Sequence, residues 1–184
     1  MLPGIHFAAM TTPKFQDLVT WQQAEVLMQP AFIRLVDNLR KQLEQSTWKG
    51  TYAEVPMWSD AVSANVRFKV TQLQAELKTA SAEELIAIES ALAQLPSPHP
   101  SYQLHLQQQE RTVTVDLWNL CYEICFQHYD AASGGSHALG SIGSKQGVKI
   151  DDTLFDEAGD VDWERLDQKV KQVVERTFAA LPTD

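Results

Sequence analysis

Two consecutive apolar stripes at helical spacing constrain the fold of this chain more than any other feature. The first stripe comprises Val62, Val66, Val70, Leu73 and Leu77, and the second comprises Leu85, Ile88, Leu92 and Leu95. Residues three or four apart share one face of an α-helix, so each stripe predicts an amphipathic helix. Between them, Ser81 and Glu84 form the S-x-x-E pattern of a capping box. Prolines at 96, 98 and 100 end the second helix and form the internal linker that we expect.

Helical periodicity also covers both ends of the chain. A helix is predicted to start at Pro13 and to finish near Gln45, with Pro30 either kinking it or starting a second helix. The last helix is predicted to begin near Asp162 and to stop at Pro182. The expected fold is therefore mainly α, an irregular bundle of five or six helices.

Residues 102–115 fit both a strand and a helix. Apolar residues alternate at Tyr102, Leu104 and Leu106 and again at Val113 and Val115, which favours two short strands. The segment between them has no glycine or asparagine for a tight hairpin turn. We favour a strand-like segment followed by a helix from Asp116 to about Tyr129. The expected bundle can therefore include a small two- or three-stranded β element between residues 102 and 150.

A length of 184 residues fits one domain. We expect a flexible N-terminal lead at 1–12, with Met10 as an alternative start, and a single globular domain at 13–184. No apolar run is long enough to cross a membrane, and the N-terminus lacks the basic and apolar regions of a secretory signal. Two cysteines are too few for a disulfide framework, so we expect reduced thiols and a cytoplasmic protein.

The net charge of −9 is concentrated in residues 151–167, where eight acidic side chains and one arginine give 1 − 8 = −7. The rest of the chain is nearly neutral and has no basic stripe, which argues against a nucleic-acid partner. Counted from Asp156 as a calcium loop, the segment has Gly159 three residues on and not at the sixth position, and the twelfth position holds Asp167 in place of the bidentate glutamate. We interpret it as an acidic docking surface for a protein partner, centred on Asp156, Asp160 and Asp162. The alternative is that these carboxylates complement the dipole of the last helix.

An aromatic segment, Trp48–Trp58, interrupts the helical pattern. It contains Trp48, Tyr52 and Trp58 together with a glycine and a proline, and we expect a loop pinned by its aromatic rings. Large aromatic side chains are enriched at binding hot spots, so these three are predicted to contact the partner. The alternative is that they bury against their own domain.

Cys121, Cys125 and His128 are spaced by four and three residues, so on a helix they lie on one side. Thiolate and imidazole are zinc ligands, with His137, Asp130 or water available as a fourth ligand. The alternative is that both cysteines belong to a buried apolar helix face. We expect no resident cofactor, with zinc or iron at this triad as the alternative.

Glycines and serines fill the loop at 133–147. Its Gly135 and Gly140 have phosphate-loop spacing, but Ser141 occupies the position of the required lysine. A solvated connection is expected, and a cap over a small-ligand pocket is the alternative.

The segment Val115–Phe126, in a glutamine-rich and lysine-poor chain, resembles uncharacterised small proteins of cyanobacterial type. That resemblance implies a bacterial cytoplasm and no assigned activity. The sequence contains no nucleophile elbow, H-E-x-x-H motif or dinucleotide fingerprint. We therefore expect a non-enzymatic interaction protein, an adaptor or assembly factor. A metal protein centred on the cysteines and a small-ligand-binding protein are the alternatives.

Overall fold

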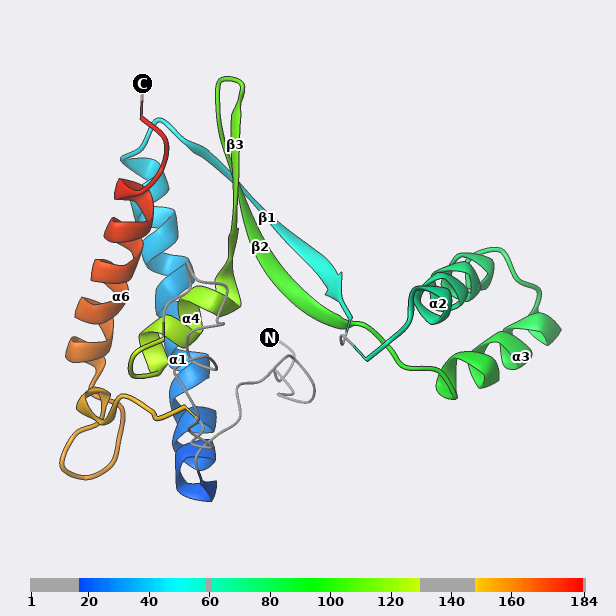
Figure 1. Cartoon of the computed structure of the whole chain (residues 1–184), viewed down its shortest axis with the longest axis horizontal. Helices are drawn as coiled ribbons and strands as arrows, with labels where there is room; N and C mark the ends of the chain where they lie inside the picture. The colour runs from blue at the N-terminus through cyan, green and yellow to red at the C-terminus, as the bar shows by residue number, and fades with distance from the viewer. Residues whose placement is uncertain (1–16, 59–60, 130–147, 184) are drawn as a thin grey trace. The chain divides into compact units, whose positions relative to one another are not determined.

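The computed structural model describes residues 17–58, 61–129 and 148–183, and these separate into two compact units (Figure 1). The first unit comprises 17–54, 102–129 and 148–183. The second comprises 55–58 and 61–101. The chain passes from the first unit to the second within strand β1 and returns within strand β2.

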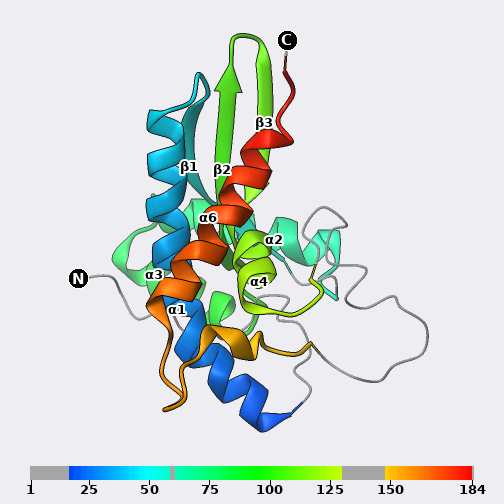
Figure 2. The same cartoon turned by 90° about the vertical axis from the view of Figure 1, so that its left-hand side faces the viewer.

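Three helices form the body of the first unit: α1 (Leu18–Glu44), α4 (Leu117–Cys125) and α6 (Trp163–Ala179). Helices α1 and α6 lie side by side and run in the same direction (Figures 1 and 2). The guanidinium carbon of Arg34 lies 5.4 Å from the ring centroid of Trp163. One turn further along, Asn38 Nδ2 lies 3.3 Å from Asp167 Oδ1. Helix α4 packs against both long helices.

Helix α1 continues through Pro30, so the predicted alternative of a second helix starting there is wrong. A proline inside a helix loses one backbone hydrogen bond. Its neighbours Leu27, Met28 and Ala31 are fully buried, and their packing offsets that loss. Asp17 caps the helix by accepting a 2.8 Å hydrogen bond from the backbone N–H of Thr20.

A small antiparallel sheet completes the first unit, with the order β1 (Lys49–Met57), β2 (His99–Gln108) and β3 (Arg111–Asp116). The expected combination of predominant helices with a small sheet is thus confirmed. The predicted loop at Trp48–Trp58 is wrong, because most of that segment is β1. As an edge strand with mostly exposed side chains, β1 shows no apolar alternation and accommodates Pro56.

Strands β2 and β3 form a hairpin, although the sequence offered no usual turn residue. Gln108 pairs with Arg111, which leaves a two-residue turn in which Gln109 adopts φ 52°. Glycine or asparagine usually occupies such a conformation, which is why the turn was not expected. On the inner face of the sheet, Leu104 pairs with Val115.

Helix α4 begins as predicted, with Asp116 accepting a 3.0 Å hydrogen bond from the backbone N–H of Asn119. It ends at Cys125 and not at about Tyr129, which corrects the predicted boundary. Phe126 is extended (φ −110°, ψ 149°) and forms an isolated bridge with Ile150. A pairing between distant segments therefore ends this helix.

Close packing joins the sheet to the end of α1. A Cβ atom on Gly50 would lie 2.6 Å from Leu43 Cδ1 and 3.0 Å from Leu104 Cδ1. Glycine at this position therefore lets strand β1 approach the core. The fully buried side chains of the first unit come from all its layers and include Leu35, Leu104, Leu117, Ile124, Leu154 and Leu166.

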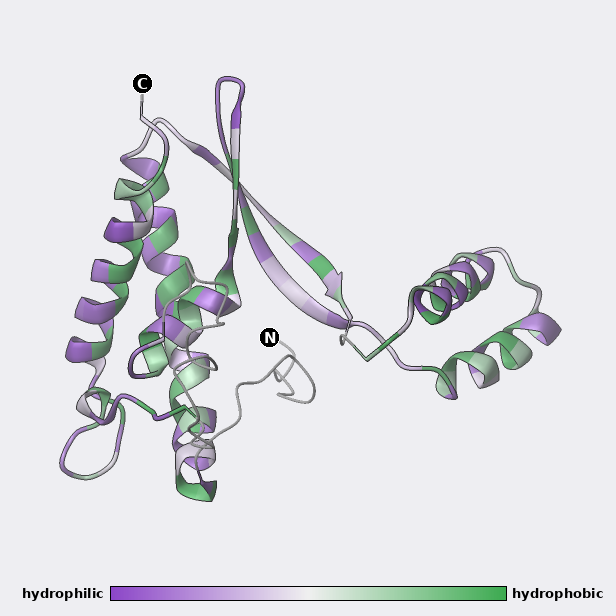
Figure 3. Cartoon of the chain, viewed as in Figure 1, coloured by the Kyte–Doolittle hydropathy of each residue, from purple (hydrophilic) through white to green (hydrophobic). Residues whose placement is uncertain are grey.

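The second unit contains two helices, α2 (Ala64–Leu77) and α3 (Ala82–Ala93), which pack on each other. The predicted capping box is confirmed: the Ser81 backbone N–H donates to Glu84 Oε2 at 2.9 Å. Figure 3 shows hydrophobic and hydrophilic residues interleaved along both helices. Across the described parts of the chain, no helix combines the length and the apolar character needed to cross a membrane.

Candidate functional site

The exposed surface of α2 and α3 is the candidate site. Within 55–58 and 61–101, Val70 is the only buried apolar side chain, and Ser101 is the only buried polar one. The other residues of the predicted stripes are only half-buried. The contact between α2 and α3, the α2–α3 seam, therefore buries little apolar surface.

Phe68 and Ile86 stand out from this seam, and each is 72% exposed. Phe68 lies two residues from both Val66 and Val70, which places it about half a turn away from the apolar stripe of α2. Ile86 similarly lies beside the stripe of α3 and not within it. A third large apolar side chain, Met57, is 41% exposed in the same unit.

Two of the charged side chains of this unit lie at a helix start. Glu83 and Glu84 occupy the first turn of α3, where negative charge is favourable. The hydrogen bond from the Ser81 backbone holds the pKa of Glu84 below its ordinary value. Three basic and four acidic side chains give the described part of the unit a net charge of 3 − 4 = −1. The exposed apolar residues thus lie on a nearly neutral surface.

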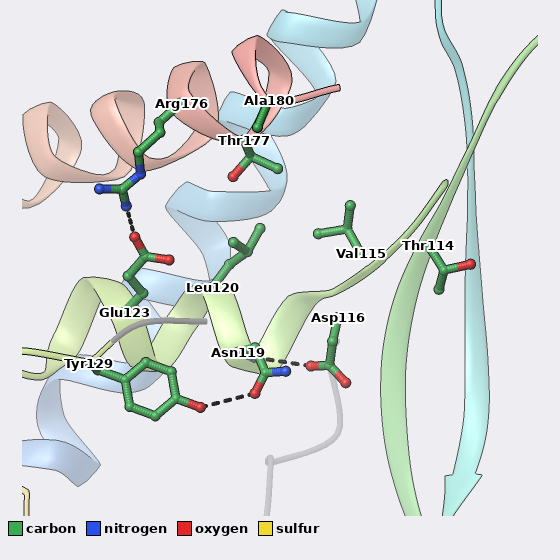
Figure 4. A pocket seen from close by; sticks show the side chains of 10 residues that line it. All are labelled: Thr114, Val115, Asp116, Asn119, Leu120, Glu123, Tyr129, Arg176, Thr177 and Ala180. Carbon is green, nitrogen blue, oxygen red and sulfur yellow. Dashed lines mark hydrogen bonds and ion pairs between the residues drawn. The ribbon is translucent and has the colours of Figure 1, made fainter. Parts of the chain in front are cut away.

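A polar groove of about 600 Å³ lies between β3, α4 and α6 in the first unit (Figure 4). Its polar side chains contact each other. Arg176 forms an ion pair with Glu123, and the Tyr129 hydroxyl donates a 3.0 Å hydrogen bond to Asn119 Oδ1. The remaining lining residues are Thr114, Val115, Asp116, Leu120, Thr177 and Ala180.

A second hollow of about 420 Å³ adjoins this groove along α6 and shares Glu123, Tyr129 and Arg176 with it. Here Lys169 Nζ lies 2.5 Å from Asp151 Oδ2. Burial alone would raise the pKa of Asp151, but hydrogen bonds from Lys169 and Thr153 outweigh it and lower the pKa. Arg176 and Lys169 of α6 each pair with a carboxylate of another segment. We interpret these ion pairs as contacts that hold α6 against the rest of the first unit.

The predicted metal ligands are not brought together as a cluster. Cys121 and Cys125 are fully buried in α4, and the Cys121 thiol lies 3.7 Å from the carbonyl oxygen of Met28. A hydrogen bond with Cys125, together with burial, raises the pKa of Cys121 well above its ordinary value. His128 is exposed beyond the helix end, with φ 56°. In the described segments, no three His, Cys, Asp or Glu side chains are arranged to hold a metal. His137, Asp130 and the loop at 133–147 lie outside the described residues.

The aromatic segment is divided between the two units. Trp48 is buried in the first unit, whereas Tyr52 is 44% exposed there, with its pKa raised by burial. Trp58 is half-buried in the second unit. The three rings thus have different environments, and their contact with a partner stays a prediction.

The acidic residues have mainly local roles. Asp156 Oδ1 accepts hydrogen bonds from the backbone N–H groups of Ala158 and Asp160, at 2.9 and 3.0 Å, and so closes a turn. Asp162 caps α6 by accepting a 3.0 Å hydrogen bond from the backbone N–H of Arg165. Asp160 is exposed. Docking of a partner on this segment also stays a prediction.

Sequence reasoning missed Phe68 and Ile86, although the sequence carries a signal for them. Each is a large apolar residue inside a predicted helix but off its apolar stripe. A soluble helix usually places polar residues there. Such an off-stripe residue indicates a second contact surface.

Compared with protein families, curated proteins and solved structures, the chain matches none.

Proposed function

We propose that this chain is a non-enzymatic interaction protein, an adaptor or assembly factor, that binds another protein through helices α2 and α3. One observation carries the proposal: Phe68 and Ile86 are each 72% exposed in a unit whose described residues bury a single apolar side chain, Val70. Exposed large apolar residues grouped on one small unit are typical of protein-binding surfaces.

The helices are specified locally but are weakly supported by packing. Their N-termini have caps at Ser63 and Ser81, so the sequence fixes where each begins. Helices of 14 and 12 residues are marginal in water without tertiary contacts. The small seam provides few such contacts. A partner that covers Phe68 and Ile86 would therefore stabilise both helices.

The chemistry of this surface favours an apolar protein groove as its partner. A net charge of −1 over the described unit does not suit the phosphates of a nucleic acid. Phe68 and Ile86 would serve as anchors, since full burial of such a side chain contributes about 1.5–3 kcal/mol. Met57 lies in the same unit and would extend the contact.

The proposal is tested by isolating the full chain from its native cells and reconstituting any stoichiometric partner with purified components. The decisive variant combines Phe68→Gln with Ile86→Gln, which removes both anchors while keeping helix propensity and charge. Gln74→Ala, an exposed position on α2, is the matched control. Binding is measured by titration calorimetry.

We expect the double variant to weaken binding at least about a hundredfold, because two anchors are lost at about 1.5 kcal/mol or more each. The control variant should bind as the wild type does. Equal affinities of the double variant and the wild type would contradict the proposal. A partner that binds elsewhere on the chain and leaves α2 and α3 unprotected from hydrogen exchange in the complex would contradict it too.

A further inference from the structure

Helix α1 carries an exposed apolar stripe in addition to its core face. Val19, Val26 and Ile33 are 61%, 54% and 49% exposed and recur every seven residues. Seven residues make nearly two helical turns, so the three side chains lie along one line. Gln22 and Gln29 occupy the same face at the same interval. These five residues are named the outer stripe of α1.

The outer stripe lies opposite the face that packs in the core. The buried residues Ala24, Leu27, Ala31 and Leu35 face α4 and α6. A helix on the surface of a domain usually has one apolar face and one polar face. Helix α1 has two apolar faces along the stretch from Val19 to Ile33, which spans about 21 Å.

The charge distribution favours a second copy of this chain as the occupant. The whole chain carries −9, so two copies repel each other over most orientations. Helix α1 is an exception: it has no net charge over its full length, and Glu25 is the one charged residue between Val19 and Ile33. No member of the outer stripe is charged. The ion pairs of Asp37 with Lys41 and of Arg40 with Glu44 begin only beyond it.

The outer stripe is also self-complementary. Branched side chains at a seven-residue interval pack well between paired helices. Glutamine amides both donate and accept hydrogen bonds, so the glutamines of one copy can pair with those of another. Val26 lies midway between Val19 and Ile33. Any two-fold arrangement that covers the whole stripe therefore places Val26 of one copy beside Val26 of the other.

We propose that two copies of this chain associate through the outer stripe of α1, with Val26 at the centre of the contact. A single helix pair buries less surface than the roughly 800 Å² per partner of a typical stable complex. The dimer therefore forms in a concentration-dependent way. It does not involve Phe68 or Ile86, so the variant that removes both of those residues should dimerise as the wild type does.

Sedimentation velocity on the full chain provides the first test. The wild type should shift from 20.7 kDa toward twice that mass as its concentration rises. Val26→Glu should raise the dissociation constant at least about tenfold, because it replaces two apolar contacts with facing carboxylates. Glutamate has a higher helix propensity than valine, so α1 should remain folded. Gln107→Glu adds the same charge at an exposed position of β2 and is the control.

Cysteine crosslinking provides the second test. Val26→Cys should form an intermolecular disulfide under mild oxidation, whereas Lys41→Cys, an exposed position beyond the stripe, should not. The natural Cys121 and Cys125 are fully buried and do not interfere. A wild type that stays monomeric, or a Val26→Glu variant that dimerises equally well, would overturn the proposal. Protection of Val26→Cys from a thiol reagent in the monomer would do so too, by placing the stripe under the chain's own residues.

Discussion

The helices of the two units are stabilised in different ways. In the first unit, α1, α4 and α6 bury a continuous set of apolar side chains and one face of a sheet. In the second unit, α2 and α3 have well-defined capped ends, but among the described residues only Val70 is a buried apolar side chain. Helix propensity and capping thus specify where helices form, whereas burial decides how strongly they are held.

This difference bears on function. Regions with few buried contacts open more easily than a packed core, and binding elements are often drawn from such regions. The same second unit carries the exposed Phe68 and Ile86. We therefore expect the first unit to provide a stable body and the second to gain stability when a partner covers it.

The largest expected effect is a loss of stability on shortening a buried side chain, and it should differ between the two units. Leu35→Ala, in the first unit, should lower the free energy of unfolding by about 2–5 kcal/mol, because Leu35 is fully buried. Val70→Ala, in the second unit, should leave the global urea midpoint nearly unchanged, since Val70 is the only buried apolar side chain among the described residues of that unit. Far-UV circular dichroism during urea unfolding measures both. Similar losses of unfolding free energy in the two variants would contradict the view that only the first unit is held by its core.

Gly50 tests how tightly the sheet packs on α1. In Gly50→Ala the new methyl group would lie 2.6 Å from Leu43 Cδ1. We expect a loss of about 1–3 kcal/mol in unfolding free energy, because a neighbouring side chain must move. Thr51→Ala, at an exposed position of the same strand, is the control in urea unfolding. If both variants are equally stable, the packing at this point is looser than proposed.

The ion pair of Asp151 with Lys169 is expected to contribute a smaller, pH-dependent stabilisation. Asp151→Asn should lower the unfolding free energy by about 1–3 kcal/mol at neutral pH. The pKa of Asp151 is lowered in the folded chain, so its contribution is complete above the ordinary carboxyl pKa of 3.8 and is lost as the pH falls through the folded value.

The stability gap between wild type and Asp151→Asn should therefore close in acid. Urea unfolding across the range from neutral pH to below the ordinary carboxyl pKa measures it. Asp160→Asn, at an exposed position, should be as stable as the wild type throughout. A gap that persists unchanged in acid would show that the ion pair is not its cause.

The smallest expected effect concerns the capping box of α3. Ser81→Ala should destabilise this helix by about 1 kcal/mol and speed hydrogen exchange in it. Exchange in α1 and α6 should not change, because the first unit holds itself together. The exposed, mid-helix Ser90→Ala is the control. Faster hydrogen exchange in α6 of the Ser81→Ala variant would mean that the two units are energetically coupled.

Local sequence patterns predicted most of the helices and only part of the sheet. The stripe from Val66 to Leu77, the capping box at Ser81 and the start of the last helix near Asp162 depend on residues near each other in the chain, and these predictions were confirmed. Val62, the first residue of the predicted stripe, precedes the N-cap Ser63 and so lies outside α2. Strand β1 was missed because an exposed edge strand shows no alternation. The end of α4 was missed because it depends on the bridge between Phe126 and Ile150.

The candidate surfaces were harder to predict, because exposure depends on the whole fold. Composition alone does not separate Trp48, which is buried, from Tyr52, which is partly exposed on the same strand. For Phe68 and Val26 the apolar periodicity of the helix is more informative. Both lie outside the stripe that forms the core, and both are exposed in the structure.

Hydrogen exchange on the isolated full chain, resolved by segment, tests the central claim most directly. We expect amides in α1, α4 and α6 to exchange only through global unfolding and those in α2 and α3 to exchange far faster. Addition of the purified partner should slow exchange in α2 and α3 selectively. Equal protection of all five helices in the isolated chain would contradict the claim that α2 and α3 need a partner to be held.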